Sequence, residues 1–122
     1  MKVLHVFDTV GVASILCKYL RKMFDVDTKI ITRAVLDKWG IVKFYGEAER
    51  LSCGPWYFGL KCLKEAGKYD LIPIHGWEKI VPFIRALWHK PLILHYHGTD
   101  IRRLQNLKSK RTLMRSADKI LY

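Results

Sequence analysis

A histidine in the last third of the sequence follows a run of residues that reads as a buried strand. His97 comes directly after the apolar stretch 91–96, and Gly98 beside it leaves room for a ligand to approach the backbone. An imidazole in this position can hydrogen-bond a hydroxyl or a phosphate oxygen. Thr99 and Asp100 are expected to cap the next helix. With Gly98 they complete a candidate binding turn for a ligand hydroxyl or a phosphate group.

The same stretch also has a feature of metal sites. His95 lies two residues before His97, so on a strand the two rings share a face. That spacing suits a metal ion, but no acid or cysteine set stands nearby to complete the ligands, and no metal site is predicted. His5 and His89 are expected to be structural or exposed to solvent.

Two further turns combine glycine with polar residues. Gly11 precedes a predicted helix whose free amides could hold an anion, and Val12 opens that helix. The turn matches neither the dinucleotide fingerprint nor the P-loop, and Gly11 could equally serve only to permit a tight turn. The second turn, His75-Gly76-Trp77, is a candidate ligand-binding loop.

Strands and helices alternate along the chain. Strands are expected at 3–7, 27–31, 41–45, 70–74, 91–96 and 119–122, and helices over 12–23, from 54 to 63 or 66, over 79–88 and over 101–114. This alternation predicts an α/β fold: one domain over 1–122, with an open, mostly parallel Rossmann-like sheet and helices on both faces. If strand order begins 3-2-1-4-5, the three turns lie along one edge of the sheet.

The first helix has a two-sided pattern. Its apolar residues recur at helical spacing, which predicts that they form the buried side, while its basic residues take the other side. The apolar set is Val12, Ile15, Leu16, Tyr19, Leu20 and Met23, and the basic set is Lys18, Arg21 and Lys22.

Positive charge is the strongest signal in the composition. The formal net charge is +11, from 22 lysines and arginines against 11 acidic residues. Much of it lies near the end of the chain, where Asp118 is the single opposing acid; the basic residues there are Arg102, Arg103, Lys108, Lys110, Arg111, Arg115 and Lys119. This surface favours anionic partners, although a solvated helix face explains it equally well.

Targeting signals and cysteine motifs are not evident. The apolar run at the start reaches Asp8 without a small-residue cleavage site, and it reads better as a strand than as a secretory leader. The three cysteines (Cys17, Cys53 and Cys62) have no CxxC spacing. A cytoplasmic location is expected, with contact at the inner face of an anionic membrane as an extension of it.

Several segments together resemble the N-terminal domain of family 4 (group 1) glycosyltransferases, archaeal type. The most specific is Lys90-Pro91-x-x-x-His95-x-His97-Gly98-x-Asp100, followed by the Ala117-Asp118-Lys119 strand. Lys-Val-Leu-His-Val near the start, Gly11-Val12-Ala13-Ser14 and the Asp70 to Gly76 segment support it. The resemblance covers nearly the whole chain. It departs from the family in its first loop, which has a single glycine where many members have two.

The resemblance implies a GT-B enzyme, in which two Rossmann-like domains face each other across a cleft. Such an enzyme is retaining and transfers a sugar from a nucleotide-sugar to a phosphorylated, lipid-linked or glycan acceptor. This chain corresponds to the acceptor side. His97 then matches a contact to the donor sugar, Gly11 matches a contact to phosphate or acceptor, and His75, Gly76 and Trp77 fall in an acceptor loop.

The donor-binding domain, with its Glu-x7-Glu motif, has no counterpart here. The chain is therefore expected to be catalytically incomplete by itself and to hold no cofactor of its own, the nucleotide-sugar belonging to the complete enzyme. The expected situations are a separately encoded C-terminal partner, a homo-oligomer, or a truncated remnant.

Two other function classes stay open. One is a basic α/β module that binds nucleic acid or a phosphorylated ligand without chemistry, although no known RNA- or DNA-binding motif interrupts the pattern. The other is a redox or nucleotide-binding Rossmann domain, against which the missing glycine fingerprint counts.

Overall fold

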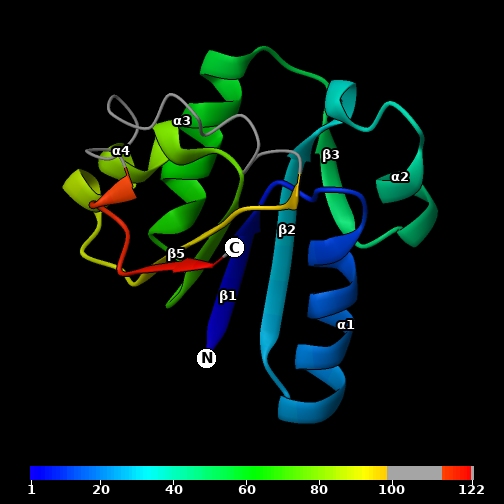
Figure 1. Cartoon of the computed structure of the whole chain (residues 1–122), viewed down its shortest axis with the longest axis horizontal. Coiled ribbons are helices and arrows are strands. Elements are labelled where there is room, and N and C mark those ends of the chain that lie inside the picture. The colour runs from blue at the N-terminus through cyan, green and yellow to red at the C-terminus, as the bar shows by residue number, and fades with distance from the viewer. Residues whose placement is uncertain (99–113, 122) are drawn as a thin grey trace.

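The computed structural model describes residues 1–98 and 114–121, and these form an α/β fold around a parallel sheet (Figure 1). The sheet has six strands in the order β3-β2-β1-β4-β5-β6, and every pairing is parallel. The strands are β1 (Lys2–Val6), β2 (Asp27–Arg33), β3 (Ala48–Leu51), β4 (Ile72–His75), β5 (Leu92–His95) and β6 (Lys119–Leu121). The helices are α1 (Val12–Phe24), α2 (Ile41–Tyr45), α3 (Pro55–Ala66) and α4 (Val81–Leu87), with 3-10 turns η1 (Ala34–Leu36) and η2 (Glu78–Ile80).

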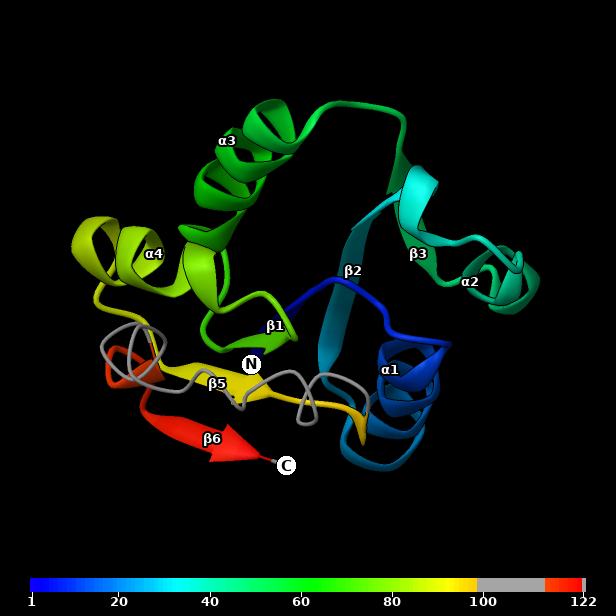
Figure 2. The same ribbon diagram turned by 45° about the horizontal axis from the view of Figure 1, so that its top comes forward.

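The two faces of the sheet carry different side chains. On one face, Leu4, Ile74 and Leu94 belong to the main core beneath α3 and α4. On the other face, Ile30 of β2 packs against α1, and its register partner on β1 is His5. Figure 2 shows α3 and α4 together on one side of the sheet and α1 on the other. The predicted Rossmann-like architecture is confirmed.

Helix α1 packs on the sheet with a different side from the one expected, although Val12 and Leu20 of the expected side are half-buried. Its buried residues are the small ones, Ala13, Ser14 and Cys17. Of the predicted apolar side, Tyr19 is 59% exposed and Met23 67%. Small side chains allow the helix to approach the sheet closely, so close approach prevailed over burial of the larger apolar residues. The result is an apolar stripe turned toward solvent.

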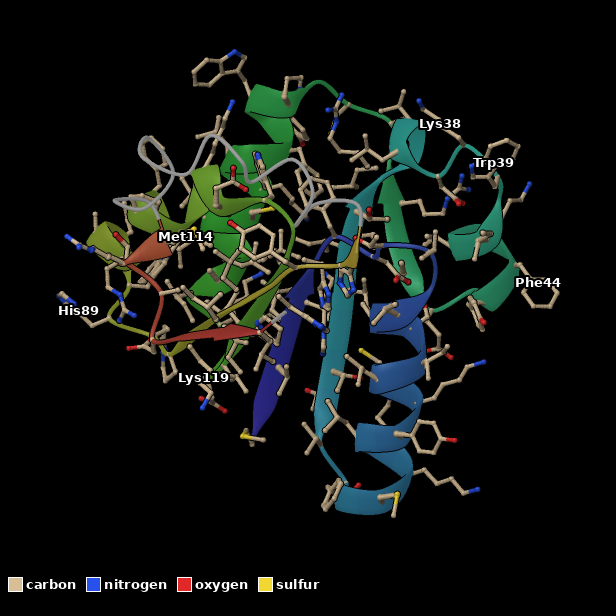
Figure 3. The ribbon with its side chains drawn as sticks, in the orientation of Figure 1. Lys38, Trp39, Phe44, His89, Met114 and Lys119 are labelled. Carbon is tan, nitrogen blue, oxygen red and sulfur yellow. The ribbon has the colours of Figure 1, made fainter. Side chains whose placement is uncertain are left out.

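The strand expected over 41–45 is wrong, because these residues form the short helix α2. The carboxylate of Asp37 accepts hydrogen bonds from the amides of Val42 (3.0 Å) and Lys43 (2.9 Å), which satisfies the start of the helix. Left-handed glycines, Gly40 and Gly46, bound it at both ends. The third strand comes later, as β3, at the edge of the sheet. Figure 3 shows Phe44 of α2 projecting away from the sheet.

Pro73 occupies a central strand, where a missing N–H leaves a gap in the ladder. Between β1 and β4 the paired positions are Val3 with Leu71 and Val6 with Ile74, with no ladder pair between them. Both pairs keep the same register, so the strand is not bulged. The proline therefore interrupts the hydrogen bonding while leaving the strand in place.

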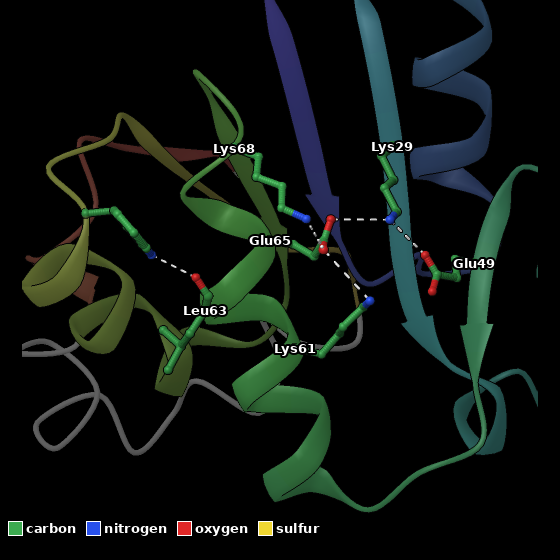
Figure 4. Close-up of polar contacts among 7 residues, drawn as sticks. Lys29, Glu49, Lys61, Leu63, Glu65 and Lys68 are labelled. Atoms are coloured by element: carbon green, nitrogen blue, oxygen red, sulfur yellow. Dashed lines mark hydrogen bonds and ion pairs between the residues drawn. The ribbon is translucent and has the colours of Figure 1, made fainter.

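An ion-pair group on Glu65 ties α3 to the sheet (Figure 4). The Glu65 side chain is 6% exposed, and its carboxylate lies 2.9 Å from Lys68, 3.3 Å from Lys29 and 3.8 Å from Lys61. Lys29 also pairs with Glu49 at 2.9 Å, so β2, β3 and α3 share one network. The hydrogen bond from Lys68 leads the effects that lower the pKa of Glu65.

Replacing Glu65 tests this network. Glu65→Gln should lower the free energy of unfolding by about 1–3 kcal/mol, because it removes the charge that the lysines share in a buried position. The pKa of Glu65 is lowered in the folded state, so the difference is present at neutral pH and shrinks as pH falls through that lowered pKa. Urea unfolding at pH 7 and pH 3 measures both effects.

Glu49→Gln is the matched control. Its carboxylate is 40% exposed and pairs with Lys29, so its loss should cost less than about 1 kcal/mol. Equal costs for the two variants would show that burial of Glu65 contributes nothing.

Candidate functional site

Three loops from the first, fourth and fifth strands meet at the carboxyl edge of the sheet. Gly11 and Val12 follow β1, His75 ends β4, and His97 follows β5. The expected order 3-2-1-4-5 is confirmed, with β6 added beyond β5. Strand order reverses between β1 and β4, which is where open α/β sheets hold their ligands.

The amides at the start of α1 are already engaged within the chain. The carboxylate of Asp8 accepts hydrogen bonds from the amides of Ala13 (2.9 Å) and Ser14 (3.2 Å) and from the Ser14 hydroxyl. Asp8 therefore takes the place that an anionic ligand would occupy at this helix end. A phosphate could bind there only if Asp8 moved away.

Gly11 is explained by the packing of its own neighbours. Its φ is +83°, a left-handed conformation, and a Cβ built on it would lie 2.2 Å from Cε2 of Tyr45. The aromatic ring covers the open side of the glycine. Both features are consistent with the alternative left open above, a glycine that serves the turn.

A pocket opens at the same edge of the sheet. It has a volume of about 280 Å³ and is lined by Phe7, Arg33, Leu36, Pro55, His75, Gly76 and Trp77. The Trp77 ring meets Phe7 edge-on at 5.0 Å and lies 5.7 Å from Phe58, so it is held from two sides. Phe7 itself has a φ of 67°, which is strained for a residue with a side chain.

Arg33 supplies the positive charge of this pocket. Its Nε donates a hydrogen bond to the carbonyl oxygen of Cys53 at 3.2 Å, which fixes the guanidinium. Among the described residues no carboxylate lies within ion-pair distance of it. The sequence interpretation missed Arg33; its position at the end of β2, on the carboxyl edge, was the available signal.

The histidines of three neighbouring strands form a contiguous cluster on the α1 face, which we call the histidine cluster (His5, His75, His95 and His97). His75 and His95 are register partners on β4 and β5. Nδ1 of His5 lies 3.0 Å from Nε2 of His75, and Nδ1 of His75 lies 3.0 Å from Nε2 of His97. These three rings are stacked, and His95 lies with its ring centroid 4.2 Å from that of His97.

Burial favours the neutral form of His5, His75 and His95. It lowers the pKa of His75 to about 2, with a further contribution from His5, and it lowers the pKa of His5 to about 4. The pKa of His95 is also lowered by burial. At neutral pH the rings of His5 and His75 therefore each have one protonated and one unprotonated nitrogen, and in each N···N contact one atom donates to the other.

Sequence reasoning identified two members of the histidine cluster and separated the others. His95 and His97 were placed on one face, and the absence of a third ligand argued against a metal. The missing partner is His75, whose ligand atom lies within 4.8 Å of those of the other two. His5 was expected to be structural or exposed, and it is buried. The strand register, which cannot be read from the sequence, brings all four together.

Most of the basic segment lies outside the described residues. This holds for Thr99, Asp100, Arg102, Arg103, Lys108, Lys110 and Arg111, and for most of the helix expected over 101–114. Gly98 and Arg115 are described and exposed. Asp118 pairs with Arg85 of α4 and accepts a hydrogen bond from the amide of Leu92 at 2.8 Å, so it fixes the start of β6 beside β5.

The fold has a counterpart among solved structures. A crystal structure of a protein of unknown function from Vibrio parahaemolyticus matches with a TM-score of 0.53 at 16% identity, over 98% of this chain and 91% of that one. At this identity the likeness shows the fold alone. No family model matches the chain, and no curated protein matches it either. In the described part of the chain, no helix combines the length and apolarity needed to cross a bilayer.

The neutral histidines predict a stability that falls on acidification. The folded pKa values of His75 (about 2) and His5 (about 4) lie below the ordinary value of 6.5, so the unfolded chain binds more protons below pH 6.5. Each histidine should add a slope of about 1.4 kcal/mol per pH unit, with stability present above pH 6.5 and lost below it. Urea unfolding between pH 7 and 5, in metal-free buffer, measures the slope.

Two variants locate its source. His75→Gln should show a shallower slope than the unmodified chain, whereas His89→Gln should not change it, because His89 is exposed. An unchanged slope in His75→Gln would contradict the prediction.

The contact between Gly11 and Tyr45 predicts a second stability effect. Gly11→Ala combines a left-handed φ with a clash against the ring, and Gly46→Ala has a similar φ of +67° with nothing within 4 Å. Gly46→Ala should cost about 1–2 kcal/mol, and Gly11→Ala distinctly more. Thermal unfolding compares them. If adding Tyr45→Ala to Gly11→Ala reduced the loss of stability toward that of Gly46→Ala, the additional loss in Gly11→Ala would be due to the Tyr45 ring.

Proposed function

We propose that this chain is the acceptor-side half of a sugar-transferring enzyme of GT-B architecture, and that the pocket beside Trp77 receives a phosphorylated or glycan acceptor. The observation that carries the proposal is the pairing of Arg33 and Trp77 in one pocket at the reversal of strand order. The resemblance of the His95 to Asp100 segment to family 4 glycosyltransferases supports the same assignment.

The two side chains supply complementary chemistry. A guanidinium binds phosphate oxygens through a rigid fork of N–H donors, and Arg33 has no carboxylate partner in the described region to compete for it. The face of an indole ring packs against the apolar side of a sugar ring or a lipid chain. Phe7 and Phe58 hold Trp77 in position, so little ordering is left for the moment of binding.

The proposal also needs His97 and a donor-binding domain. On the glycosyltransferase assignment His97 contacts the donor sugar, while a donor-binding domain brings the nucleotide-sugar to the other wall of the cleft. That domain belongs to another part of the same protein, to a separate chain, or to an arrangement with a second copy. The exposed apolar stripe of α1, with Tyr19 and Met23, is a surface that a protein partner could cover.

A binding module without chemistry is the second candidate, and the net charge of +11 favours it. The same pocket would then recognise a phosphorylated ligand for its own sake, or the basic surface would bind nucleic acid or an anionic membrane. The discriminating experiment supplies a donor-binding domain and a nucleotide-sugar, and asks whether sugar reaches the acceptor.

Binding to the pocket is testable with small probes. Glucose 6-phosphate should bind more tightly than glucose or inorganic phosphate, and in NMR titrations it should shift the indole N–H of Trp77. Arg33→Gln should weaken that binding about 10- to 100-fold, because a hydrogen bond to a charged group is worth about 1.5–3 kcal/mol. Trp77→Ala should weaken glucose 6-phosphate and glucose alike.

Lys38→Gln is the matched control. It removes one exposed positive charge outside the pocket lining, so it should leave affinity unchanged apart from a small general effect of charge. If Arg33→Gln and Lys38→Gln weakened binding equally, the pocket would not be the site.

A further inference from the structure

We propose that His75, His95 and His97 form a binding site for a divalent transition-metal ion, with His5 positioning the ring of His75. The ligand atoms of the three residues lie within 4.8 Å of one another, at the carboxyl edge of β4 and β5. This site does not depend on the sugar-transfer proposal, and it would bind a metal whatever the pocket beside Trp77 accepts.

One pair of ligand atoms already lies close to the separation that a tetrahedral ion requires, and the third ligand atom lies within 4.8 Å of both. With metal–nitrogen distances of 2.0–2.1 Å, two ligand nitrogens of a tetrahedral site lie about 3.3 Å apart. Nδ1 of His75 and Nε2 of His97 are separated by 3.0 Å. An opening of a few tenths of an ångström is enough to admit an ion between them, and His95 and His97 are both only half-buried.

The protonation state matches that of a metal site. Metal ligation needs an unprotonated imidazole nitrogen, and the 3.0 Å contact between Nδ1 of His75 and Nε2 of His97 leaves one of these two nitrogens without a proton. In the metal-free chain one proton lies between His75 and His97. In the metal-bound chain that nitrogen pair faces the ion, so the rings adopt the tautomers His75 Nε2–H and His97 Nδ1–H. Each ring keeps one proton, and none is released overall.

His5 completes the arrangement behind the ligands. A metal-ligating histidine usually donates its other ring N–H to an acceptor, which fixes its tautomer and orientation. Nε2 of His75 lies 3.0 Å from Nδ1 of His5, and the His5 ring is buried. His5 can accept this hydrogen bond only as its own Nε2–H tautomer. That Nε2 has no hydrogen-bond partner among the described residues.

The donor set selects the class of ion. Among the described residues the donor set is three imidazoles without a carboxylate, which suits Zn²⁺, Cu²⁺ or Ni²⁺ and offers little to Mg²⁺ or Ca²⁺, which prefer oxygen ligands. Three protein ligands also leave a fourth tetrahedral position for a water molecule or a ligand oxygen. A donor set made of imidazoles alone would leave the ion its full positive charge, which would attract an anion to this edge of the sheet.

The experiment titrates the purified, chelator-treated chain with metal ions. Calorimetry monitors the binding of Zn²⁺, and visible absorption monitors the binding of Co²⁺. One ion should bind per chain, and Co²⁺ should give a tetrahedral spectrum without a thiolate charge-transfer band. Long-range ¹H–¹⁵N spectra of the imidazoles should show three rings losing an unprotonated nitrogen signal to the metal. Mg²⁺ should have no effect.

Variants at the half-buried ligands keep the test independent of folding. His95→Gln and His97→Gln should each weaken Zn²⁺ binding at least about 100-fold, with the fold checked by circular dichroism. The control is His89→Gln, which removes an exposed histidine that lies beside α4, away from the cluster (Figure 3), and should bind like the unmodified chain.

The role of His5 has its own test. His5→Leu should weaken Zn²⁺ binding about 10- to 100-fold, and His5→Gln, which retains an acceptor, should recover part of that loss. Three results would overturn the proposal: no Zn²⁺ binding by the folded chain, binding that His95→Gln and His97→Gln leave unchanged, or a Co²⁺ spectrum with thiolate ligation. The first would leave the cluster as a hydrogen-bonded stack of neutral rings.

Discussion

The parallel pairing of β4 with β1 on one side and with β5 on the other decides where the candidate functional residues lie. Crossover connections carry the chain from β1 outward through β2 to β3, and then back across to β4 and outward through β5 to β6. The loops after β1 and β4 therefore diverge to opposite faces, and the edge between them stays open. Pro73 weakens the ladder at this junction, yet the register holds on both sides of it.

Two kinds of chemistry meet at that edge. Near the ends of β2 and β4, Arg33 and Trp77 form a charged and aromatic pocket. On the α1 face, His5 and His75 of the histidine cluster are neutral, because burial penalises a charged imidazole and the neighbouring histidines lower its pKa further. His75 belongs to both, since it lines the pocket and stands at the centre of the cluster. An ion held by the cluster would therefore lie close to whatever the pocket binds.

The helices also distribute roles unevenly. α3 covers the main core and is anchored by Glu65, whose carboxylate gathers lysines from the strand and from the helix itself. α1 is held instead by small residues and by Asp8 at its first turn. Its larger apolar side chains face outward, which keeps a surface available to another protein or domain. In this way the sheet is stabilised from one side and remains accessible on the other.

Sequence alone determined the alternation of strands and helices, the parallel sheet and the edge at which the loops gather. These features depend on local periodicity and on glycine and proline positions, such as the Gly54-Pro55 start of α3. The helix over 41–45 could not be predicted from the sequence, because the carboxylate of Asp37 and two left-handed glycines outweigh a short apolar pattern. Which side of α1 faces solvent could not be predicted either, since hydrophobicity does not reveal that small residues allow closer packing.

Only the tertiary structure decided which histidines meet. His5, His75 and His97 are separated by 70 and 22 residues along the chain, and their contacts depend on the register of β1, β4 and β5. A shift of one residue in that register would turn a histidine to the other face of the sheet. The position of Arg33 in the pocket likewise depends on strand pairing, which places the end of β2 near the end of β4. The residue types were visible in the sequence, but their juxtaposition is a property of strand pairing.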